Sequence, residues 1–188
     1  PGGIDAKYIL GGQGNLWTEN VWNGRHAEYM TWPRSLALAE VFWSPANKRN
    51  WSSFIKRMER QFAYMDVAQV KYARSVYDPI ITGVIDKEAN GTKKSRMDTT
   101  FYPPFKGQWL NSALRVKLAT EIPGLDIYYT FDGTNPDNFY PKYDGRPLEI
   151  PKGALGDSEI RVVTYRDGKP VGRQVNCRLS EVARRIER

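Results

Sequence analysis

The sequence predicts an α+β chain in two parts, residues 1–75 rich in helix and residues 76–188 rich in strand. Two patterns predict this division. Between residues 51 and 65 apolar side chains recur at helical spacing, which indicates an amphipathic helix. From residue 76 onward β-branched and aromatic residues alternate with polar ones, and turn dipeptides such as Asp132-Gly133 recur. We expect the boundary between Tyr72 and Pro79, where the composition changes.

The first part opens on a short apolar run, Tyr8 to Leu10, that leads into a glycine-rich turn and then Trp17 and Glu19. A strand that runs into such a turn is how a (β/α)8 barrel delivers side chains to the carboxyl end of its strands. An indole offers a flat apolar face to a sugar ring, and a carboxylate accepts hydrogen bonds from neighbouring hydroxyls. Spacing alone leaves two interpretations open: a sugar-binding pair, or a core tryptophan beside a helix-terminal charge.

The order of residues in this region resembles a known family. The run from Ile9 to Glu19, followed by the run from Glu28 to Ser44, closely resembles the last strand and helix of the catalytic barrel in glycoside hydrolase family 20. The resemblance implies an exo-acting β-N-acetylhexosaminidase whose partners are N-acetylhexosamine-containing glycans. It also implies that Trp17 lines the pocket around the sugar and that Glu19 binds its hydroxyls. One departure is Trp32, which stands where the family has phenylalanine.

The same resemblance implies a retaining mechanism in which the acetamido oxygen of the substrate attacks the anomeric carbon. In the family an adjacent Asp-Glu pair assists this step. The chain has no Asp-Glu dipeptide, and the nearest approximations, at 86–88 and 157–159, lie in turn-like surroundings beyond the barrel segment. A closed barrel also needs roughly 250 residues. We therefore expect a C-terminal portion of the enzyme that holds no catalytic residue and is inactive alone.

A helix is expected from about Arg25 to Trp43, interrupted by Pro33. Proline lacks the amide hydrogen that a helix interior needs, but it fits the first position of a new helix. Arg34 and Glu40 are charges within this mostly apolar segment, and we expect a mutual ion pair or one to another element.

Two residues near this helix have alternative roles. Trp22 either rims the sugar pocket or packs beneath it, and we favour packing because the family pattern does not fix that position. His26 is expected to be a surface or capping residue rather than an acid-base group.

A second helix is expected from Trp51 to about Ala68. Its apolar stripe is expected to be core that covers the outside of the barrel: Trp51, Phe54, Ile55, Met58, Phe62 and Met65. Without the rest of the barrel, such faces remain exposed, and large exposed apolar patches promote association. We therefore expect the fragment to self-associate through the faces that carry Leu36, Trp43, Phe54 and Phe62.

The second part is expected to be a small antiparallel β-sandwich of the immunoglobulin or fibronectin type. Its predicted strands cover residues 80–86, 113–121, 126–131, 148–150, 159–166 and 173–178. Asp132 and Gly133 are expected to form a turn, so Asp132 is no catalytic acid. A charged helical tail is expected from Ser180 to Arg188.

The run Tyr129 to Pro136 resembles the C-terminal domain that accompanies chitobiases and related hexosaminidases. Trp109, Tyr140 and Tyr143 offer a sugar platform there, but in so small a domain we favour a place in the core or in the interface to the barrel. The alternative function for the whole chain is a non-catalytic carbohydrate-binding or assembly module.

Composition argues against other classes of partner and cofactor. The net charge is +7, but the basic residues are spread without a dense stripe or a reader motif, which favours solvated surface over a nucleic-acid partner. Apolar runs fall far short of the roughly 20 residues of a spanning helix, so no membrane partner is expected. With one cysteine and one histidine we expect neither an internal disulfide nor a zinc cluster of Cys and His, and no cofactor. The family resemblance suggests a secreted, periplasmic or lysosomal protein.

Overall fold

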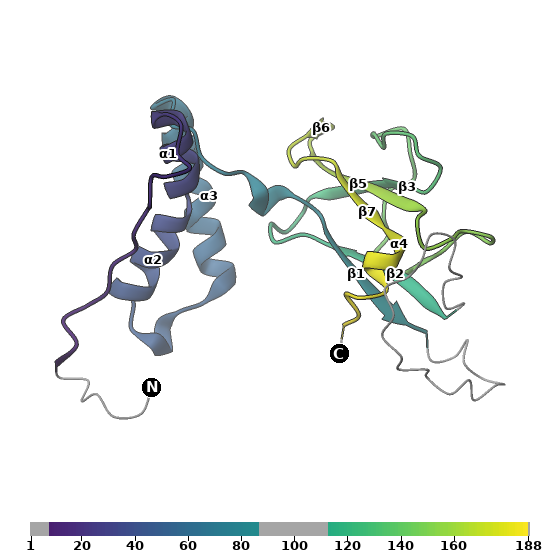
Figure 1. Cartoon of the computed structure of the whole chain (residues 1–188), viewed down its shortest axis with the longest axis horizontal. Helices are drawn as coiled ribbons and strands as arrows, with labels where there is room; N and C mark the ends of the chain where they lie inside the picture. The colour runs from purple at the N-terminus through teal and green to yellow at the C-terminus, as the bar shows by residue number, and fades with distance from the viewer. Residues whose placement is uncertain (1–7, 87–112, 188) are drawn as a thin grey trace. The chain divides into compact units, whose positions relative to one another are not determined.

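The computed structural model describes residues 8–86 and 113–187. The chain divides into two compact units, Pro1–Ala73 and Arg74–Arg188, called here unit 1 and unit 2. Unit 1 contains helices and no strand among its described residues, whereas unit 2 contains all the strands (Figure 1). The predicted α+β class with antiparallel sheets is therefore confirmed.

Unit 1 begins with two short helices that Pro33 separates, α1 (Gly24–Thr31) and α2 (Arg34–Trp43). The N-cap of α1 is Asn23, whose side-chain oxygen accepts a 2.9 Å hydrogen bond from the His26 amide. The predicted interruption is confirmed, although Pro33 is the N-cap of α2 and not its first helical residue. A proline is tolerated there because the cap amide makes no intrahelical bond.

A short turn, η2 (Ala46–Lys48), leads to the longest helix, α3 (Trp51–Val67). Asn50 caps α3 by accepting a 2.9 Å bond from the Ser53 amide. The central part of the predicted stripe is buried: Phe54, Ile55, Met58 and Phe62. Trp51, at the start of the stripe, is 59% exposed, so the stripe is only partly core.

The expectation that Phe54 and Phe62 are exposed in this chain is wrong, because they are 7% and 2% exposed. Phe62 stacks on Tyr72 with ring centroids 4.4 Å apart. The segment after α3 therefore folds back and supplies the cover that we had assigned to a barrel.

That returning segment is held to the region of α1 and Pro33. The Lys71 amide donates to a Glu28 carboxylate oxygen at 2.7 Å, and the Ala73 amide donates to the Trp32 carbonyl at 3.0 Å. The second bond gives a partner to the amide of Ala73, a residue that is only 1% exposed. The two bonds hold the segment after α3 against the α1 end of unit 1.

Tyr8 to Leu10 is not a strand in this structure, contrary to prediction. A strand needs a hydrogen-bonded neighbour, and unit 1 offers no other strand among its described residues. The segment is instead exposed, and the chain that follows it leads up to α2 (Figure 1).

In unit 2 all six predicted strands are confirmed, each with ends within two residues of the prediction. After the turn η3 (Ser75–Tyr77) they are β1 (Ile80–Ile85), β2 (Leu114–Ala119), β3 (Asp126–Thr130), β4 (Leu148–Glu149), β5 (Glu159–Arg166) and β7 (Val175–Arg178). The unpredicted β6 (Lys169–Pro170) is a two-residue return beside the end of β5.

The strands form two antiparallel sheets. One has the order β1-β2-β4, and in the other β5 lies between β3 on one side and β6 and β7 on the other. One cluster of buried side chains draws on both sheets, with Val116 and Leu118 from the first and Ile127, Ile160 and Val162 from the second. Alternate residues of each strand face this core, as the period of two requires.

The expected helical tail is wrong. Helix α4 covers only Leu179–Val182, and the chain then returns to β1, where Ile186 forms a parallel bridge with Gly83. The Gly83 amide donates to the Arg185 carbonyl, and the Glu187 amide donates to the Gly83 carbonyl, both at 3.0 Å. Pairing with an otherwise open strand edge therefore replaces the local helical preference at the end of the chain.

Candidate functional site

The loop that carries Trp17 and Glu19 lies directly against α2. A side chain on Gly12 would come within 2.6 Å of the Phe42 ring, and one on Gly14 within 2.5 Å of Leu38. Cβ atoms essentially never come so close to another atom, so a side chain at either position would require Phe42 or Leu38 to move. The glycine-rich stretch thus anchors the loop, and the residues after it project from α2.

Trp17 and Glu19 both lie at the surface of this loop, and Trp17 is 74% exposed. Trp17 is therefore not part of the buried core that the structure describes in unit 1. Within the described residues no hydrogen bond or ion pair engages the Glu19 carboxylate, while a turn follows in which the Val21 amide donates to the Thr18 carbonyl at 3.0 Å. An exposed indole and an exposed carboxylate, two residues apart, can offer a stacking face and a hydrogen-bond acceptor to one polar ligand.

Trp22 does not pack in this structure, contrary to expectation, since it is 84% exposed. The residue belongs to the loop between Glu19 and α1, where no other described element covers it. His26 lies in the first turn of α1 and takes part through its backbone amide in the Asn23 cap, which agrees with a capping position.

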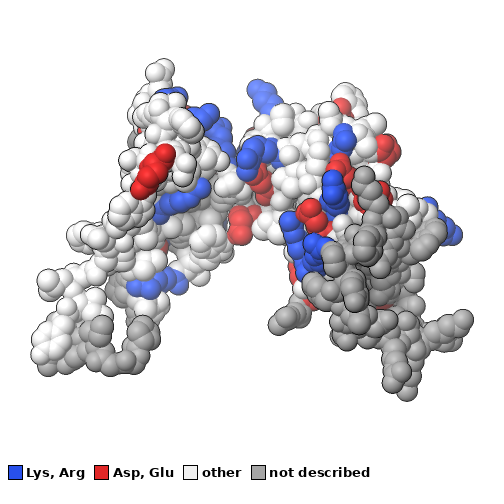
Figure 2. Space-filling view, viewed as in Figure 1, with Lys and Arg blue, Asp and Glu red and all other residues white. Residues whose placement is uncertain are grey.

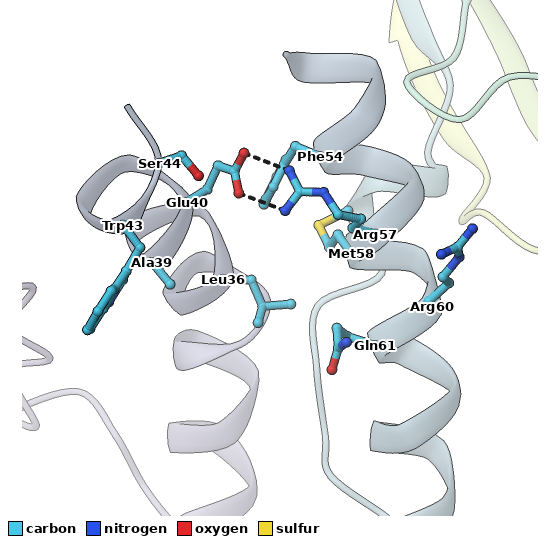
Figure 3. Close-up of a pocket in the computed structure, with 10 residues that line it drawn as sticks. All are labelled: Leu36, Ala39, Glu40, Trp43, Ser44, Phe54, Arg57, Met58, Arg60 and Gln61. Carbon is cyan, nitrogen blue, oxygen red and sulfur yellow. Dashed lines mark hydrogen bonds and ion pairs between the residues drawn. The ribbon is translucent and has the colours of Figure 1, made fainter. Parts of the chain in front are cut away.

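The expected ion pair of Glu40 is found, with a partner on another helix. Arg57 of α3 bonds both carboxylate oxygens of Glu40, at 2.6 and 2.9 Å (Figure 3). Hydrogen bonds from Arg57 hold the pKa of the Glu40 carboxyl below its ordinary value. Arg34 instead donates to the carbonyls of Tyr29 and Met30, at 3.0 and 2.9 Å, and so satisfies the end of α1.

The Glu40–Arg57 pair lies in a groove of about 480 Å³ between α2 and α3. Leu36, Phe54 and Met58 line its apolar part, and the Trp43 ring points away from α3 (Figure 3). Sequence analysis did not identify Arg57 as the partner of Glu40. Its position on the polar face of α3 is the feature of the sequence that could have indicated it. Because both charges of the pair are neutralised within the protein, the groove is a helix contact and not an acid-base site.

In unit 2 the predicted turn role of Asp132 is confirmed. Its carboxylate accepts a 2.9 Å bond from the Thr134 amide and a second, short bond from the Thr134 hydroxyl. These bonds lower the pKa of Asp132, so it holds a negative charge and stabilises the turn. Gly133 adopts φ of 82°, which glycine reaches without strain.

Of the three aromatics considered for a sugar platform, Trp109 lies outside the described residues. Tyr143 is half-buried against the core of unit 2, as expected. Tyr140 is half-buried too, and its hydroxyl lies 2.7 Å from the Thr134 hydroxyl. Tyr140 and Tyr143 do not form an exposed platform.

Three other kinds of functional feature were sought in the described residues: a metal site, a membrane-spanning helix and a basic surface. Among residues 8–86 and 113–187, no three His, Cys, Asp or Glu residues come together as a metal site would require. Over the same residues, no helix has the length and apolar character to cross a membrane. Basic and acidic side chains alternate over the visible surface of each unit and do not gather into one basic face (Figure 2).

Two segments of the chain match family models. Residues 3–46 match glycosyl hydrolase family 20, catalytic domain. Residues 116–176 match the model described as Fn3 associated. The first match contains the loop with Trp17 and Glu19 together with α1 and α2, and the second contains most of the strands of unit 2.

Three curated relatives are similar to the chain. A β-hexosaminidase of Porphyromonas gingivalis is 33% identical over 66 residues, which is 35% of this chain and 8% of the relative. N,N'-diacetylchitobiase of Vibrio harveyi is 25% identical over 169 residues, 88% of this chain and 18% of the relative. A β-hexosaminidase of Akkermansia muciniphila is 35% identical over 60 residues, 31% of this chain and 12% of the relative.

The matched part of the chain thus spans less than a fifth of the length of each of these relatives. The two family matches follow the same order as the two units and agree with the names of the relatives. The chain is thus similar to glycosyl hydrolase family 20 at residues 3–46, which match part of the family's catalytic domain, and to the Fn3-associated model at residues 116–176.

Proposed function

We propose that the chain is the C-terminal portion of an exo-β-N-acetylhexosaminidase that releases terminal N-acetylglucosamine or N-acetylgalactosamine from glycans. One observation carries this proposal. The family 20 segment presents Trp17 and Glu19, both exposed, on a loop that two glycines anchor to α2. The names of the relatives, two β-hexosaminidases and a diacetylchitobiase, support the same substrate class.

In this proposal the two side chains bind one sugar ring in different ways. The Trp17 indole packs against the apolar C–H face of the N-acetylhexosamine. The Glu19 carboxylate accepts hydrogen bonds from its hydroxyls, which are stronger than those of a neutral acceptor because the carboxylate is charged. The pair thus positions the terminal sugar and performs no proton transfer.

The reaction that we propose is hydrolysis with retention, in which the acetamido oxygen of the substrate attacks the anomeric carbon and the aglycone oxygen leaves with a proton. Family 20 uses an adjacent Asp-Glu pair to orient the acetamido group and to supply that proton. No such dipeptide occurs in the 188 residues. The pair then belongs to another part of the protein, and the present chain alone is inactive.

The fold proposal follows from the same division. Residues 1–75 form the C-terminal segment of the catalytic (β/α)8 barrel, in which Tyr8 to Leu10 gain a strand neighbour. The exposed apolar side chains of α2, such as Phe42 and Trp43, then have a surface to cover. Residues 76–188 form a β-sandwich of the immunoglobulin or fibronectin type around the core that both sheets share.

Kinetics of the longer enzyme test the role of Glu19. We expect Glu19→Gln to lower kcat/KM on an aryl N-acetyl-β-glucosaminide by about 1.5–3 kcal/mol, or roughly 10- to 150-fold, because charge-assisted hydrogen bonds to the sugar are weakened. Asp157→Asn, an exposed carboxylate change in unit 2, is the matched control and leaves kcat/KM unchanged. Equal kinetics for both variants would contradict a pocket role for Glu19.

The alternative is a non-catalytic carbohydrate-binding or assembly module. The Fn3-associated match at residues 116–176 is the observation that favours it, since this segment lies outside the catalytic-domain match. Under this alternative the 188-residue chain keeps its binding function when Glu19 is changed. A version of the protein extended beyond these 188 residues would then not hydrolyse the aryl glycoside.

A further inference from the structure

The outer face of the β3-β5-β7 sheet carries a row of polar side chains where β3 ends. Thr130 pairs with Arg161, and Arg161 pairs with Asn176, so these residues stand side by side on three strands. Their neighbours Ile160 and Val162 face the core. Because side chains alternate along a strand, the row lies on the face away from this core, where Asn176 is exposed, Arg161 is half-buried and Thr130 is only 4% exposed.

Two further amides extend this row into a hydrogen-bonded patch. The carbonyl oxygen of Asn135 accepts bonds from Arg161 Nη1 and from the Gln174 amide, both at 3.1 Å. The Gln174 amide also donates to Asn176 Oδ1 at 2.9 Å. Asn135, Gln174 and Asn176 are all exposed, so their planar amides are fixed in place while one edge of each faces solvent.

Those bonds leave unused hydrogen-bonding capacity of both kinds. Within the described residues the NH2 groups of Asn135 and Asn176 have no hydrogen-bond acceptor and the Gln174 carbonyl has no donor, whereas the amide hydrogens of Gln174 are taken up by its neighbours. An amide carries two donors and one carbonyl acceptor. The patch therefore offers donors and an acceptor to the same ligand.

A large aromatic ring stands exposed on the adjoining loop. Phe139 is 92% exposed, and its amide donates to Asp137 at 2.9 Å, which fixes the backbone of its turn. This turn is joined to the one before Asn135 through the 2.7 Å contact of Tyr140 with Thr134. Leaving so large an apolar ring in water has a cost, and a ligand that covers it would recover that free energy.

The one cation of the patch has acidic neighbours. The Nε atom of Arg161 lies 3.8 Å from a Glu159 carboxylate oxygen, and, beside the hydrogen bonds from Thr134, the charge of Arg161 also helps to lower the pKa of Asp132. A patch whose cation already faces carboxylates lacks the free positive charge that would select a phosphate. Exposed amide groups, together with an exposed aromatic ring on the segment that follows Asn135, suit a neutral ligand with hydroxyls, acetamido groups and an apolar ring face, which describes an N-acetylated sugar.

We propose that this patch, centred on Asn135, Gln174 and Phe139, is a second, non-catalytic binding site for β-linked N-acetylglucosamine chains. The choice of sugar rests on the proposed hexosaminidase function, since a site outside the catalytic segment that binds the same polymer keeps substrate near the enzyme and raises its effective concentration.

Titration calorimetry of the 188-residue chain with the hexamer of β-1,4-linked N-acetylglucosamine tests the proposal. We expect Phe139→Ala and Gln174→Ala each to weaken binding roughly two- to tenfold, and the double variant roughly tenfold or more. Both residues are exposed, so both variants are expected to keep the fold. Tyr64→Ala, another exposed aromatic change, is the control and is expected to leave the affinity unchanged. Trp17→Ala is measured beside it, because the loop of unit 1 is the other place on the chain at which the hexamer can bind.

Three results would overturn the site: no binding of the hexamer by the chain, equal affinity of the Phe139→Ala and Gln174→Ala variants and the parent chain, or loss of binding only with Trp17→Ala. Equal affinity for the cellulose hexamer, which lacks acetamido groups, would overturn the assigned sugar. None of these measurements depends on hydrolysis. The hexosaminidase proposal can thus fail, by inactivity of the longer protein, while the binding result stands.

Discussion

The two units differ in how much of their apolar surface they bury. In the described residues, fourteen exposed large apolar side chains lie in unit 1 and three in unit 2. Helices α1 and α2 have no buried residue, whereas β5 alone contributes Ile160, Val162 and Val163 to the buried set. Unit 2 therefore completes its own core, and unit 1 has helices whose apolar faces need another surface.

The largest difference that we expect between the units is in association. The 188-residue chain is expected to form dimers or larger species, because exposed side chains of unit 1 such as Phe42 and Trp43 can bury each other. Light scattering is expected to give a mass above 21.6 kDa for the chain and a lower mass for the Phe42→Ser, Trp43→Ser double variant. Phe139→Ser, in unit 2, is the control. A monodisperse 21.6 kDa species for the unchanged chain would contradict this expectation.

Core truncation is the next largest effect. Ile160→Ala removes a fully buried side chain between the two sheets and is expected to lower the free energy of unfolding of unit 2 by about 2–5 kcal/mol. Leu38→Ala in unit 1, at a position 40% exposed, is expected to cost under about 1 kcal/mol. Urea denaturation followed by far-UV circular dichroism measures both. Similar costs for the two variants would contradict the difference in burial between β5 and α2.

A smaller loss of stability is expected from disrupting the contact between β1 and the C-terminal segment. A side chain on Gly83 would come within 2.6 Å of the Val182 carbonyl oxygen, so Gly83→Ala is expected to destabilise unit 2 by about 1–3 kcal/mol. Gly24→Ala, at the first residue of α1 with no atom within 4 Å, is the matched change in unit 1 and is expected to be neutral or slightly stabilising. Equal destabilisation by both changes would rule out the close approach at Gly83 as the cause.

The smallest effect concerns the ion pair of the same segment. Glu187 accepts bonds from Lys117 at 2.8 Å and from Thr82 at 3.0 Å, which lower the pKa of its carboxyl below the ordinary value of 4.5 and raise the pKa of Lys117. The lowered pKa of Glu187 stabilises the fold at any pH above the carboxyl pKa of the unfolded chain, and this stabilisation is lost as the pH falls through the pKa of the folded state. The raised pKa of Lys117 stabilises the fold at any pH below the lysine pKa of the unfolded chain, and this stabilisation is lost as the pH rises through the pKa of the folded state.

Glu187→Gln is therefore expected to destabilise unit 2 slightly at pH 7, with the difference from the parent chain shrinking as the pH falls below about 4.5. Thermal unfolding at a series of pH values measures this difference. Asp157→Asn is the control and is expected to show no such trend. A constant difference for Glu187→Gln across the acid range would mean that the effect of the variant is not electrostatic.

The strands of unit 2 could be predicted because alternation and turn residues are local signals. The strands follow from side chains such as those of β2, which alternate between buried and half-buried along one segment. The last residues could not be predicted, because their conformation depends on Gly83, about a hundred positions earlier, whose open edge accepts Ile186. Short-range helical preference is weak compared with such pairing.

In unit 1 the helix ends could be predicted from the sequence, but the burial of side chains could not. Helix ends at Pro33 and Asn50 could be predicted because each residue acts on its own neighbours. The burial of Phe62 could not, since it depends on the return of Tyr72. The candidate site has the same division. The types and spacing of Trp17 and Glu19 follow from sequence and resemblance, whereas their exposure and the contact of the loop with α2 required the structure.

The central claim is that this chain contributes the sugar-binding loop, and not the acid, of a β-N-acetylhexosaminidase. The most direct measurement compares hydrolysis of a chromogenic N-acetyl-β-glucosaminide by the 188-residue chain and by the same chain extended toward its N-terminus. Our account predicts activity in the extended form alone. Activity in the 188-residue chain would mean that a carboxylate within it performs the chemistry, and inactivity of both forms would contradict the hexosaminidase assignment itself.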